Sequence, residues 1–388
     1  MAKKLRLGVV YDFRNPPESG MRTQDLYAAV MDQVTWLDAL GLDLVWFTEH
    51  HFVEDGYLPS WIPVASAMAA RTKQMRFSCD VCLLPFNHPI RLAEDLAVLD
   101  NLSGGRVEMG VGMGYAAHEF RGFGFPQSRR LSLTDEGLEV LTRAFTGEKF
   151  SFTGKRYQFQ DVKITPGYVQ PGGPPLWVAS LAQPGAARAA RFNTNLLPQG
   201  PRSQALDPWR KAPTDSGRDP ADYRVGIIKS CLVTDDPERD WPAVREGERR
   251  RMAVYNQLRA VSGGHGGVSG ITEEARIAQT WVCWQCRALR RGTRGLHPGI
   301  RAEGYRHLGG AAGDAAGPDS PQPGAFRARC RAPIAGIVSR IAAPTTRLGR
   351  GQPRCYSNAQ IYLWLQKTTL DFRLGFSEVR NRLGAVQR

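Results

Sequence analysis

Short apolar runs alternate with longer amphipathic segments over the first 282 residues of the chain. Apolar runs of this length predict strands, and segments whose apolar residues recur at helical spacing predict helices. The strands are expected at 5–13, 42–51, 75–85, 106–114, 175–180, 194–199 and 223–236. The helices are expected at 22–40, 61–72, 88–105, 128–146, 184–191 and 236–261. A hairpin that turns at Thr153-Gly154 is expected within 149–162, and a flexible loop at 262–270.

This alternation indicates parallel strands joined by right-handed helical crossovers. Seven strand-and-helix units are present in the sequence, and an eighth would close the sheet into a barrel without edges. In such barrels the chemistry lies at the carboxyl ends of the strands. The pattern therefore predicts an α/β barrel that is one unit short.

The stretch DLVWFTEHHF (43–52) places Glu49, His50 and His51 at the carboxyl end of the second predicted strand. A metal site is disfavoured because consecutive strand residues point to opposite faces and cannot converge on one ion. General acid/base chemistry and a plain hydrogen-bonded strand end both remain open, because imidazole titrates near neutral pH. Further along the chain, His118 and Glu119 are expected to face solvent.

Targeting signals are absent from the sequence pattern. The apolar stretch near the N-terminus stops at Asp12, which does not fit a secretory signal. No run approaches the 18 or so apolar residues that a membrane span needs. The seven cysteines fit a reducing compartment. We therefore expect a cytoplasmic protein with no bound metal and no membrane contact.

The net charge of +14 is concentrated at one end of the chain. Residues 1–282 hold 33 Lys and Arg against 32 Asp and Glu, whereas residues 283–388 hold 18 against 5. Of these 18 cations, 17 are arginine, and four of the seven cysteines lie in the same segment. The composition thus divides the chain into a barrel region at 1–282 and an Arg/Gly/Pro-rich tail at 283–388.

The tail could be a basic arm for nucleic acid, a disordered extension or a product of a frameshift. It shows no aromatic stacking pattern or RNA motif, so we expect no specific nucleic-acid partner. The genetic code favours the frameshift. When the codons of residues 283–287 are read one base forward, they allow Val, Gly, Asn, Ala and Glu, which continues QTWV (279–282) as an N-cap followed by an early acid. We interpret 283–388 as out-of-frame and poorly ordered.

Five stretches together resemble the bacterial-luciferase-like family of flavin-dependent monooxygenases. They are GLDLVWFTEHHF (41–52), LPFNHPIRLAEDLAVLDNLSGGR (84–106), GVGMGYAAHEFRGFG (110–124), QSRRL (127–131) and PPLWVASLAQPGAARAARF (174–192). The resemblance covers about residues 5–282. It implies a luciferase-like (β/α)8 TIM barrel, here with the eighth β/α unit missing or corrupted.

The resemblance also implies roles for individual residues. His50 matches the family histidine near the reactive edge of the flavin, which would make it the catalytic group. Residues Cys79, Asp80 and Val81 match the third-strand bulge, where a non-proline cis peptide lies under the flavin ring. Arg129 matches a ligand of the flavin phosphate, and its planar fork suits that anion. Ser180 belongs to the stretch after the fifth barrel strand that also serves the phosphate.

The implied activity is oxidation of a small apolar organic substrate by reduced FMN and O2, with a flavin reductase as partner and a possible homodimer. Candidate pocket-lining residues are Phe13, Phe47, Tyr57 and Trp61. Met113 stands where the luciferase alpha subunit has an arginine, which leaves one cation fewer for the phosphate. An F420-dependent oxidoreductase of the same fold is therefore the alternative enzyme. A non-catalytic chain with a basic tail is the alternative outside enzymes.

Overall fold

The computed structural model describes most of the barrel region and two short segments of the tail. The described residues are 6–181, 183–199, 206, 209–211, 219, 222–234, 237–260, 281–285 and 361–367. The loop expected at 262–270 and most of the tail lie outside them.

Parallel strands form the centre of the molecule, as the sequence pattern predicts. They are β1 (Arg6–Tyr11), β2 (Leu44–Phe47), β3 (Arg76–Cys79), β4 (Cys82–Leu83), β5 (Met109–Gly112), β8 (Leu176–Ser180), β9 (Asn195–Pro198) and β10 (Val225–Thr234). The first three pair in parallel, and β4 to β10 form a second parallel run. The strand expected at 75–85 is split into β3 and β4 by the bulge at Asp80-Val81, and these two strands lie at opposite ends of the strand order.

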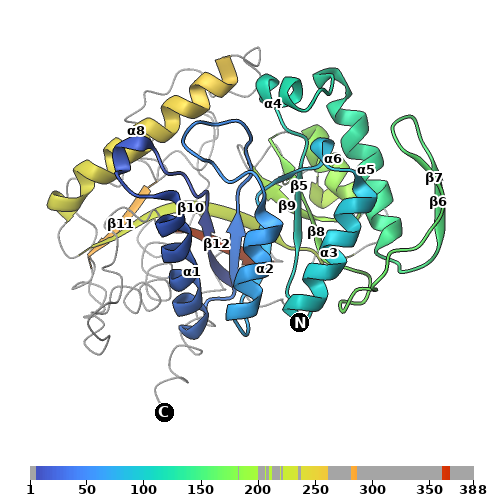
Figure 1. The fold of residues 1–388 in the computed structure, drawn as a ribbon, viewed down its shortest axis with the longest axis horizontal. Coiled ribbons are helices and arrows are strands. Elements are labelled where there is room, and N and C mark those ends of the chain that lie inside the picture. Colours follow the sequence, from blue (N-terminus) through green and yellow to red (C-terminus); the bar gives the residue numbers. More distant parts are fainter. Residues whose placement is uncertain are drawn as a thin grey trace, which may run out of the picture.

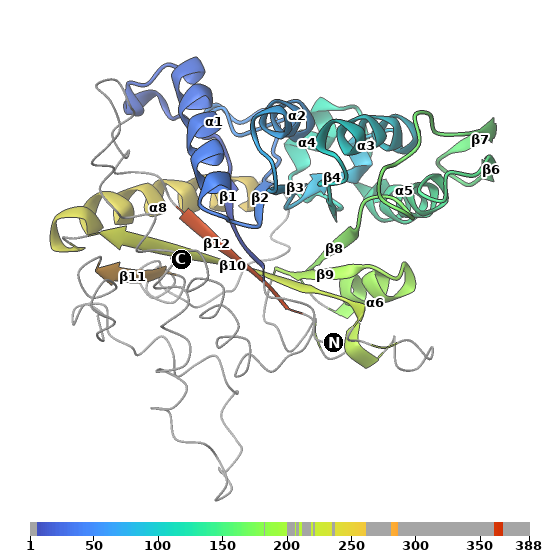
Figure 2. The ribbon, with the colours of Figure 1, turned by 90° about the horizontal axis from the view of Figure 1, so that it is seen from below.

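The place between β10 and β1 is taken by a strand from the tail. This strand, β12 (Ile361–Lys367), pairs with both neighbours and runs antiparallel to each (Figure 2). Another strand, β11 (Trp281–Gln285), pairs in parallel with the carboxyl-terminal half of β10. Unpaired strand edges expose backbone donors and acceptors that attract any available extended segment. The eighth position is thus filled by an antiparallel strand, and within the described ranges no eighth parallel β/α unit occupies it.

Helices cover the outside of the sheet, and Figure 1 shows α1, α2, α3 and α5 side by side along one flank. The long helices are α1 (Thr23–Ala39), α2 (Trp61–Arg71), α3 (Pro89–Ser103), α5 (Arg130–Ala144), α6 (Gln183–Arg191) and α8 (Pro237–Ala260). Their bounds agree closely with the helical periodicity. The expected hairpin is formed by β6 (Phe150–Thr153) and β7 (Gln158–Val162), and it projects from the side of the barrel in Figure 1. No described helix is long and apolar enough to cross a membrane.

Shorter helical turns lie at the carboxyl side of the strands. They are α4 (Ala117–Gly122) and the 3₁₀ turns η1 (Pro17–Ser19), η2 (Leu84–Phe86) and η3 (Gln127–Arg129). The sequence pattern does not predict α4, because six residues are too few to show a helical repeat.

The strands bury both of their faces. One cluster, which includes Val9 and Val45, packs between the strands and the helices. A second cluster on the opposite strand faces consists of Val10, Leu44, Trp46, Trp177 and Leu197, with the two indoles edge to face at 5.5 Å. Alternate residues of a strand point to opposite faces, so this second cluster fills the inside of the barrel.

Three of the residues expected to line a substrate pocket belong instead to the outer core. Phe13, Phe47 and Trp61 are at most 3% exposed and pack in the cluster between strands and helices. The expectation that these three side chains line a pocket was therefore wrong, because the sequence shows that they are apolar but not which strand face each occupies. Tyr57, the fourth, lies elsewhere, beside His50.

Candidate active site at the carboxyl ends of the strands

His50 lies just after β2, at the carboxyl end of the barrel, and is 7% exposed. Its backbone N–H donates to the carbonyl oxygen of Leu58 at 3.2 Å, which anchors the loop. Its Nδ1 lies 2.8 Å from Oε1 of Glu119. A buried imidazole with one nitrogen held by a carboxylate has the second nitrogen, Nε2, available for proton transfer.

Glu119 comes from α4, and its place corrects the expectation that it faces solvent. The side chain is fully buried, and Oε1 also accepts a hydrogen bond from the backbone N–H of His51 at 2.9 Å. The other oxygen, Oε2, is buried without a hydrogen-bond partner among the described residues. His118 is half-buried, and its Nε2 lies 3.0 Å from the carbonyl oxygen of His51. The pair was misplaced because α4, a single short turn over the barrel mouth, is set by tertiary contacts.

Glu49 and His51 hold the loop after β2 to neighbouring strands. Oε1 of Glu49 accepts a hydrogen bond from the backbone N–H of Leu83 in β4 at 3.1 Å and lies 3.2 Å from Nε2 of His51. These contacts fix both side chains between the loop and β4. The described part of the chain contains no cluster of three or more His, Cys, Asp or Glu side chains that could hold a metal.

The bulge between β3 and β4 contains the cis peptide that the resemblance implies, between Asp80 and Val81. The backbone N–H of Asp80 donates to the carbonyl oxygen of Phe47, which places the bulge beside the end of β2. Asp80 and Val81 are half-exposed. A Cβ on Gly112 at the end of β5 would come within 2.2 Å of Val81, so the glycine makes room for that side chain.

The three bulge side chains face different surroundings. Cys79 is fully buried in the outer core, and burial raises the pKa of its thiol, so Cys79 can meet a ligand at the barrel mouth only through its backbone. The protein atoms crowded around Asp80 raise the pKa of its carboxyl to about 7, although part of the side chain reaches solvent. The amide of Gln199 donates to Asp80 at 2.8 Å.

Ser180 ends β8 and is 2% exposed. Its carbonyl oxygen accepts a hydrogen bond from the backbone N–H of Gln199 at 2.8 Å, so Gln199 links Ser180 to Asp80. A Cβ on Gly185 would lie 2.7 Å from the Ser180 hydroxyl, so the glycine allows the first turn of α6 to approach that hydroxyl. Backbone N–H groups at the start of a helix favour an anion.

Arg129 is exposed at the end of η3, directly before α5. The helices α5 and α6 are adjacent, because Asp135 in α5 pairs with Arg188 and Arg191 in α6 at 2.5 and 2.9 Å. Arg129 and Ser180 therefore lie at the same end of the barrel.

Three tyrosines surround the His50 ring edge-on. The ring centroids of Tyr57, Tyr115 and Tyr255 lie 4.8, 5.7 and 6.0 Å from that of the imidazole. They come from the loops after β2 and β5 and from α8. The hydroxyls of Tyr57 and Tyr255 are 2.9 Å apart, a contact across 198 positions of sequence. This relation has no signal in the sequence.

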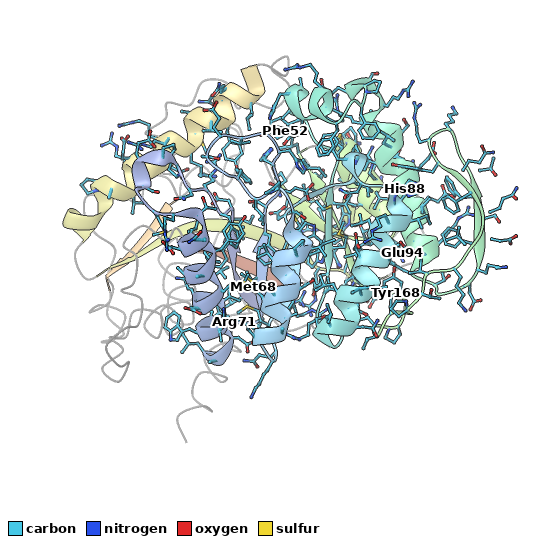
Figure 3. The ribbon with its side chains drawn as sticks, viewed as in Figure 1. Phe52, Met68, Arg71, His88, Glu94 and Tyr168 are labelled. Atoms are coloured by element: carbon cyan, nitrogen blue, oxygen red, sulfur yellow. The ribbon has the colours of Figure 1, made fainter. Side chains whose placement is uncertain are left out.

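Figure 3 shows the two ends of the barrel. Phe52, which follows the His50 loop, lies at the end where α4 is found, opposite Arg71 at the end of α2. Phe52 is 61% exposed. The polar groups of the candidate site thus gather at one end of the barrel, as the parallel strand order predicts.

Sequence comparison identifies related proteins. The family described as luciferase-like monooxygenase matches residues 5–279. A 4-hydroxyprotoasukamycin monooxygenase of Streptomyces nodosus is 30% identical over 58% of this chain and 64% of its own length. The alkanal monooxygenase alpha chain of the Kryptophanaron alfredi symbiont is 28% identical over 50% and 55%. The chain spans roughly three-fifths of the length of the curated relatives it matches, with 60% and 58% for two from Sinorhizobium fredii.

Solved structures share the fold. The monooxygenase RslO1 of Streptomyces bottropensis is 26% identical, with a TM-score of 0.59 over 66% of this chain and 78% of its own. The oxygenating component of 3,6-diketocamphane monooxygenase from Pseudomonas putida, in complex with FMN, has a TM-score of 0.56 at 17% identity, over 67% and 78%. An F420-dependent secondary alcohol dehydrogenase has a TM-score of 0.52 at 20% identity, over 63% and 74%.

Proposed function

Because this chain belongs to the luciferase-like monooxygenase family, we propose that it is a flavin-dependent monooxygenase that uses reduced FMN and O2 to oxidise a small organic substrate. The observation that carries the proposal is the buried contact between Nδ1 of His50 and Oε1 of Glu119 at the carboxyl end of β2. It provides an oriented proton-transfer group at the end of the barrel where such folds carry their chemistry.

The described residues fit a flavin in two ways. The half-exposed peptide at Asp80-Val81 offers a flat backbone surface beside the end of β2. The start of α6, with the Ser180 hydroxyl against Gly185, and the exposed Arg129 offer donors and positive charge for a phosphate. When bound, reduced FMN supplies the electrons that activate O2.

In this function, the residues around His50 orient its ring, transfer a proton and exclude water. His50 accepts or returns a proton through Nε2, while Glu119 keeps Nδ1 engaged and the ring fixed. The tyrosines around the ring limit the access of water to it. A separate flavin reductase provides the reduced cofactor. The chain acts as a homodimer in this proposal.

A deazaflavin is the second candidate cofactor. Met113 offers no positive charge where a cation would serve the flavin phosphate, which favours a cofactor that is anchored differently. The likeness to an F420-dependent structure is one of fold. Titration of the purified chain with FMN and with F420, followed by fluorescence, separates the two candidates.

Oxygen uptake tests the reaction itself. The chain would be mixed with photoreduced FMN in air-saturated buffer, with and without a panel of aldehydes and ketones, and product formation followed by mass spectrometry. We expect saturable FMN binding and a substrate-dependent oxygenated product, both lost on heat denaturation. Tight binding of F420 with none of FMN would contradict the FMN assignment. The absence of any flavin or deazaflavin binding would favour a non-catalytic chain.

We further propose that residues 283–388 are an out-of-frame translation. The support is compositional, with 17 arginines to one lysine and a clean continuation of QTWV in the shifted frame. The antiparallel direction of β12 fits this proposal, since a native eighth β/α unit would provide a parallel strand. The nucleotide sequence around codon 283 tests it directly.

A further inference from the structure

Arg14, in the loop after β1, is buried between two aromatic rings. Its side chain is 10% exposed. The guanidinium carbon lies 4.7 Å from the centroid of the Tyr57 ring and 5.1 Å from that of Tyr255. A guanidinium between two phenol rings is stabilised by cation–π attraction, but such rings satisfy none of its N–H groups.

Two donor atoms of this guanidinium are unsatisfied. Nε and Nη2 of Arg14 are buried with no hydrogen-bond partner among the described residues. Asp55 and Asp12 approach Nε only to 3.3 and 3.9 Å, as ion pairs. Buried donors without an acceptor cost free energy, so this arrangement indicates an acceptor that completes it.

The charge around Arg14 argues that this acceptor is neutral. The two carboxylates already outnumber the one guanidinium, so an anion would meet net negative charge. Each carboxylate also has its own backbone partner: Asp12 accepts from the N–H of Arg14 at 3.2 Å, and Asp55 accepts from the N–H of Tyr57 at 3.2 Å. A carbonyl oxygen, which accepts two hydrogen bonds and carries no charge, fits the two donors that lack a hydrogen bond.

The donors of Arg14 belong to the same aromatic enclosure as His50. Tyr57 and Tyr255, which flank the guanidinium, are the rings that pack edge-on against the imidazole at 4.8 and 6.0 Å. Their hydroxyls are 2.9 Å apart. Tyr115 and Tyr255 remain half-exposed, so a ligand would enter the enclosure from their side.

We propose that Arg14, Tyr57 and Tyr255 bind the carbonyl oxygen of an uncharged aromatic ketone beside His50. The inference rests on the proposed function and names the substrate class of that site. Four rings, counting His50 and Tyr115, favour a planar aromatic skeleton, because aromatic pairs gain from edge-to-face packing. Arg14 then determines specificity for the oxygen.

Calorimetric binding of a matched pair of probes to the 388-residue chain, without flavin, tests the inference. The probes are 1-tetralone and tetralin, which share a skeleton and differ by the carbonyl. A hydrogen bond to a charged donor predicts that tetralone binds about 10- to 150-fold more tightly. Arg14→Met should abolish this preference and leave tetralin binding unchanged, whereas Arg71→Met at the opposite end should have no effect.

A second variant distinguishes a loss of binding from a loss of folding. Tyr255→Phe keeps the ring and removes one hydroxyl, so it should reduce the tetralone preference several-fold while circular dichroism stays unchanged. Equal binding of tetralone and tetralin to the wild-type chain would overturn the inference, as would a preference that survives Arg14→Met. Tighter binding of 1-naphthoate than of tetralone would contradict the neutral substrate class. An FMN titration of the same samples reports separately on the proposed function.

Discussion

Oε1 of Glu119 lies 2.8 Å from Nδ1 of His50 and accepts, at 2.9 Å, the backbone N–H of His51. One buried carboxylate oxygen thus holds both the ring and the loop that carries it, from a position 69 residues further along the chain. In the proposed monooxygenase, Glu119 is a positioning residue and His50 the group that handles the proton.

His50→Ala should reduce turnover by about 10²- to 10⁴-fold, the usual contribution of a general acid/base. FMN affinity should not change, because the ring does not anchor the phosphate. His88→Ala, at an exposed histidine before α3 that Figure 3 labels, is the matched control and should keep full activity. Turnover at the wild-type rate in His50→Ala would end the assignment.

Glu119→Gln should lower turnover less than His50→Ala does. The amide oxygen can still accept from the loop, but the charge beside the imidazole is lost. Because Glu119 acts through His50, the double variant should be no slower than His50→Ala alone. Steady-state kinetics of the four proteins measure this, and additive losses would show that Glu119 has a separate role.

Arg129→Ala should weaken FMN binding about 10- to 150-fold, the range for a hydrogen bond to a charged group. Riboflavin, which has no phosphate, should bind the variant and the wild type alike. Arg71→Ala, an exposed arginine at the far end of α2, provides the control. Fluorescence titration distinguishes the two ligands, and an equal loss for both would mean that Arg129 supports the fold instead.

We expect the protein to lose stability in acid because of the Glu108 carboxylate. Burial alone would raise the pKa of Glu108, but Arg6 and Arg76, which contact it at 2.5 and 2.6 Å, outweigh burial and lower the pKa from 4.5 to about 2. The pKa of Glu108 is thus lower in the folded protein than in the unfolded chain. The contribution of Glu108 to the free energy of unfolding is therefore complete above about pH 5 and is lost as the pH falls towards 2. The shift corresponds to about 3 kcal/mol.

Urea unfolding of the wild type and of Glu108→Gln between pH 6 and 2.5 checks this prediction. The variant should be less stable at pH 6, because two half-buried guanidiniums lose the buried negative charge that they share. Its stability should also change less with pH in this window. Parallel pH dependence in the two proteins would show that other carboxylates cause the acid sensitivity.

A chain with the one-base correction at codon 283 should be more stable than the 388-residue chain. It would gain a parallel eighth strand, which removes the two edges that β12 now covers. We expect a more cooperative thermal transition and tighter FMN binding. Any nucleic-acid binding by the uncorrected chain should be independent of sequence and should fall steeply with salt. A 388-residue chain that melts as cooperatively and binds FMN as tightly would contradict the frameshift.

Local pattern in the sequence was enough to predict most of the fold. The periods of two and 3.6 residues are properties of the backbone, so apolar spacing predicted the helices α1 to α3 and α5, and the parallel order of the strands. That order alone places Glu49 and His50 at the carboxyl end of the barrel. The cis peptide at Asp80-Val81 was predicted through resemblance to the family.

Contacts between distant segments were decided only by the tertiary structure. Glu119 belongs to a six-residue helix with no periodic signal, and Tyr57 meets Tyr255 across 198 positions, so neither pairing could be inferred from spacing. Phe47 and Trp46 are equally apolar, yet one packs against helices and the other inside the barrel. The physical reason is that a sequence pattern determines which residues are buried within one element, whereas the closure of the sheet determines which buried residues meet.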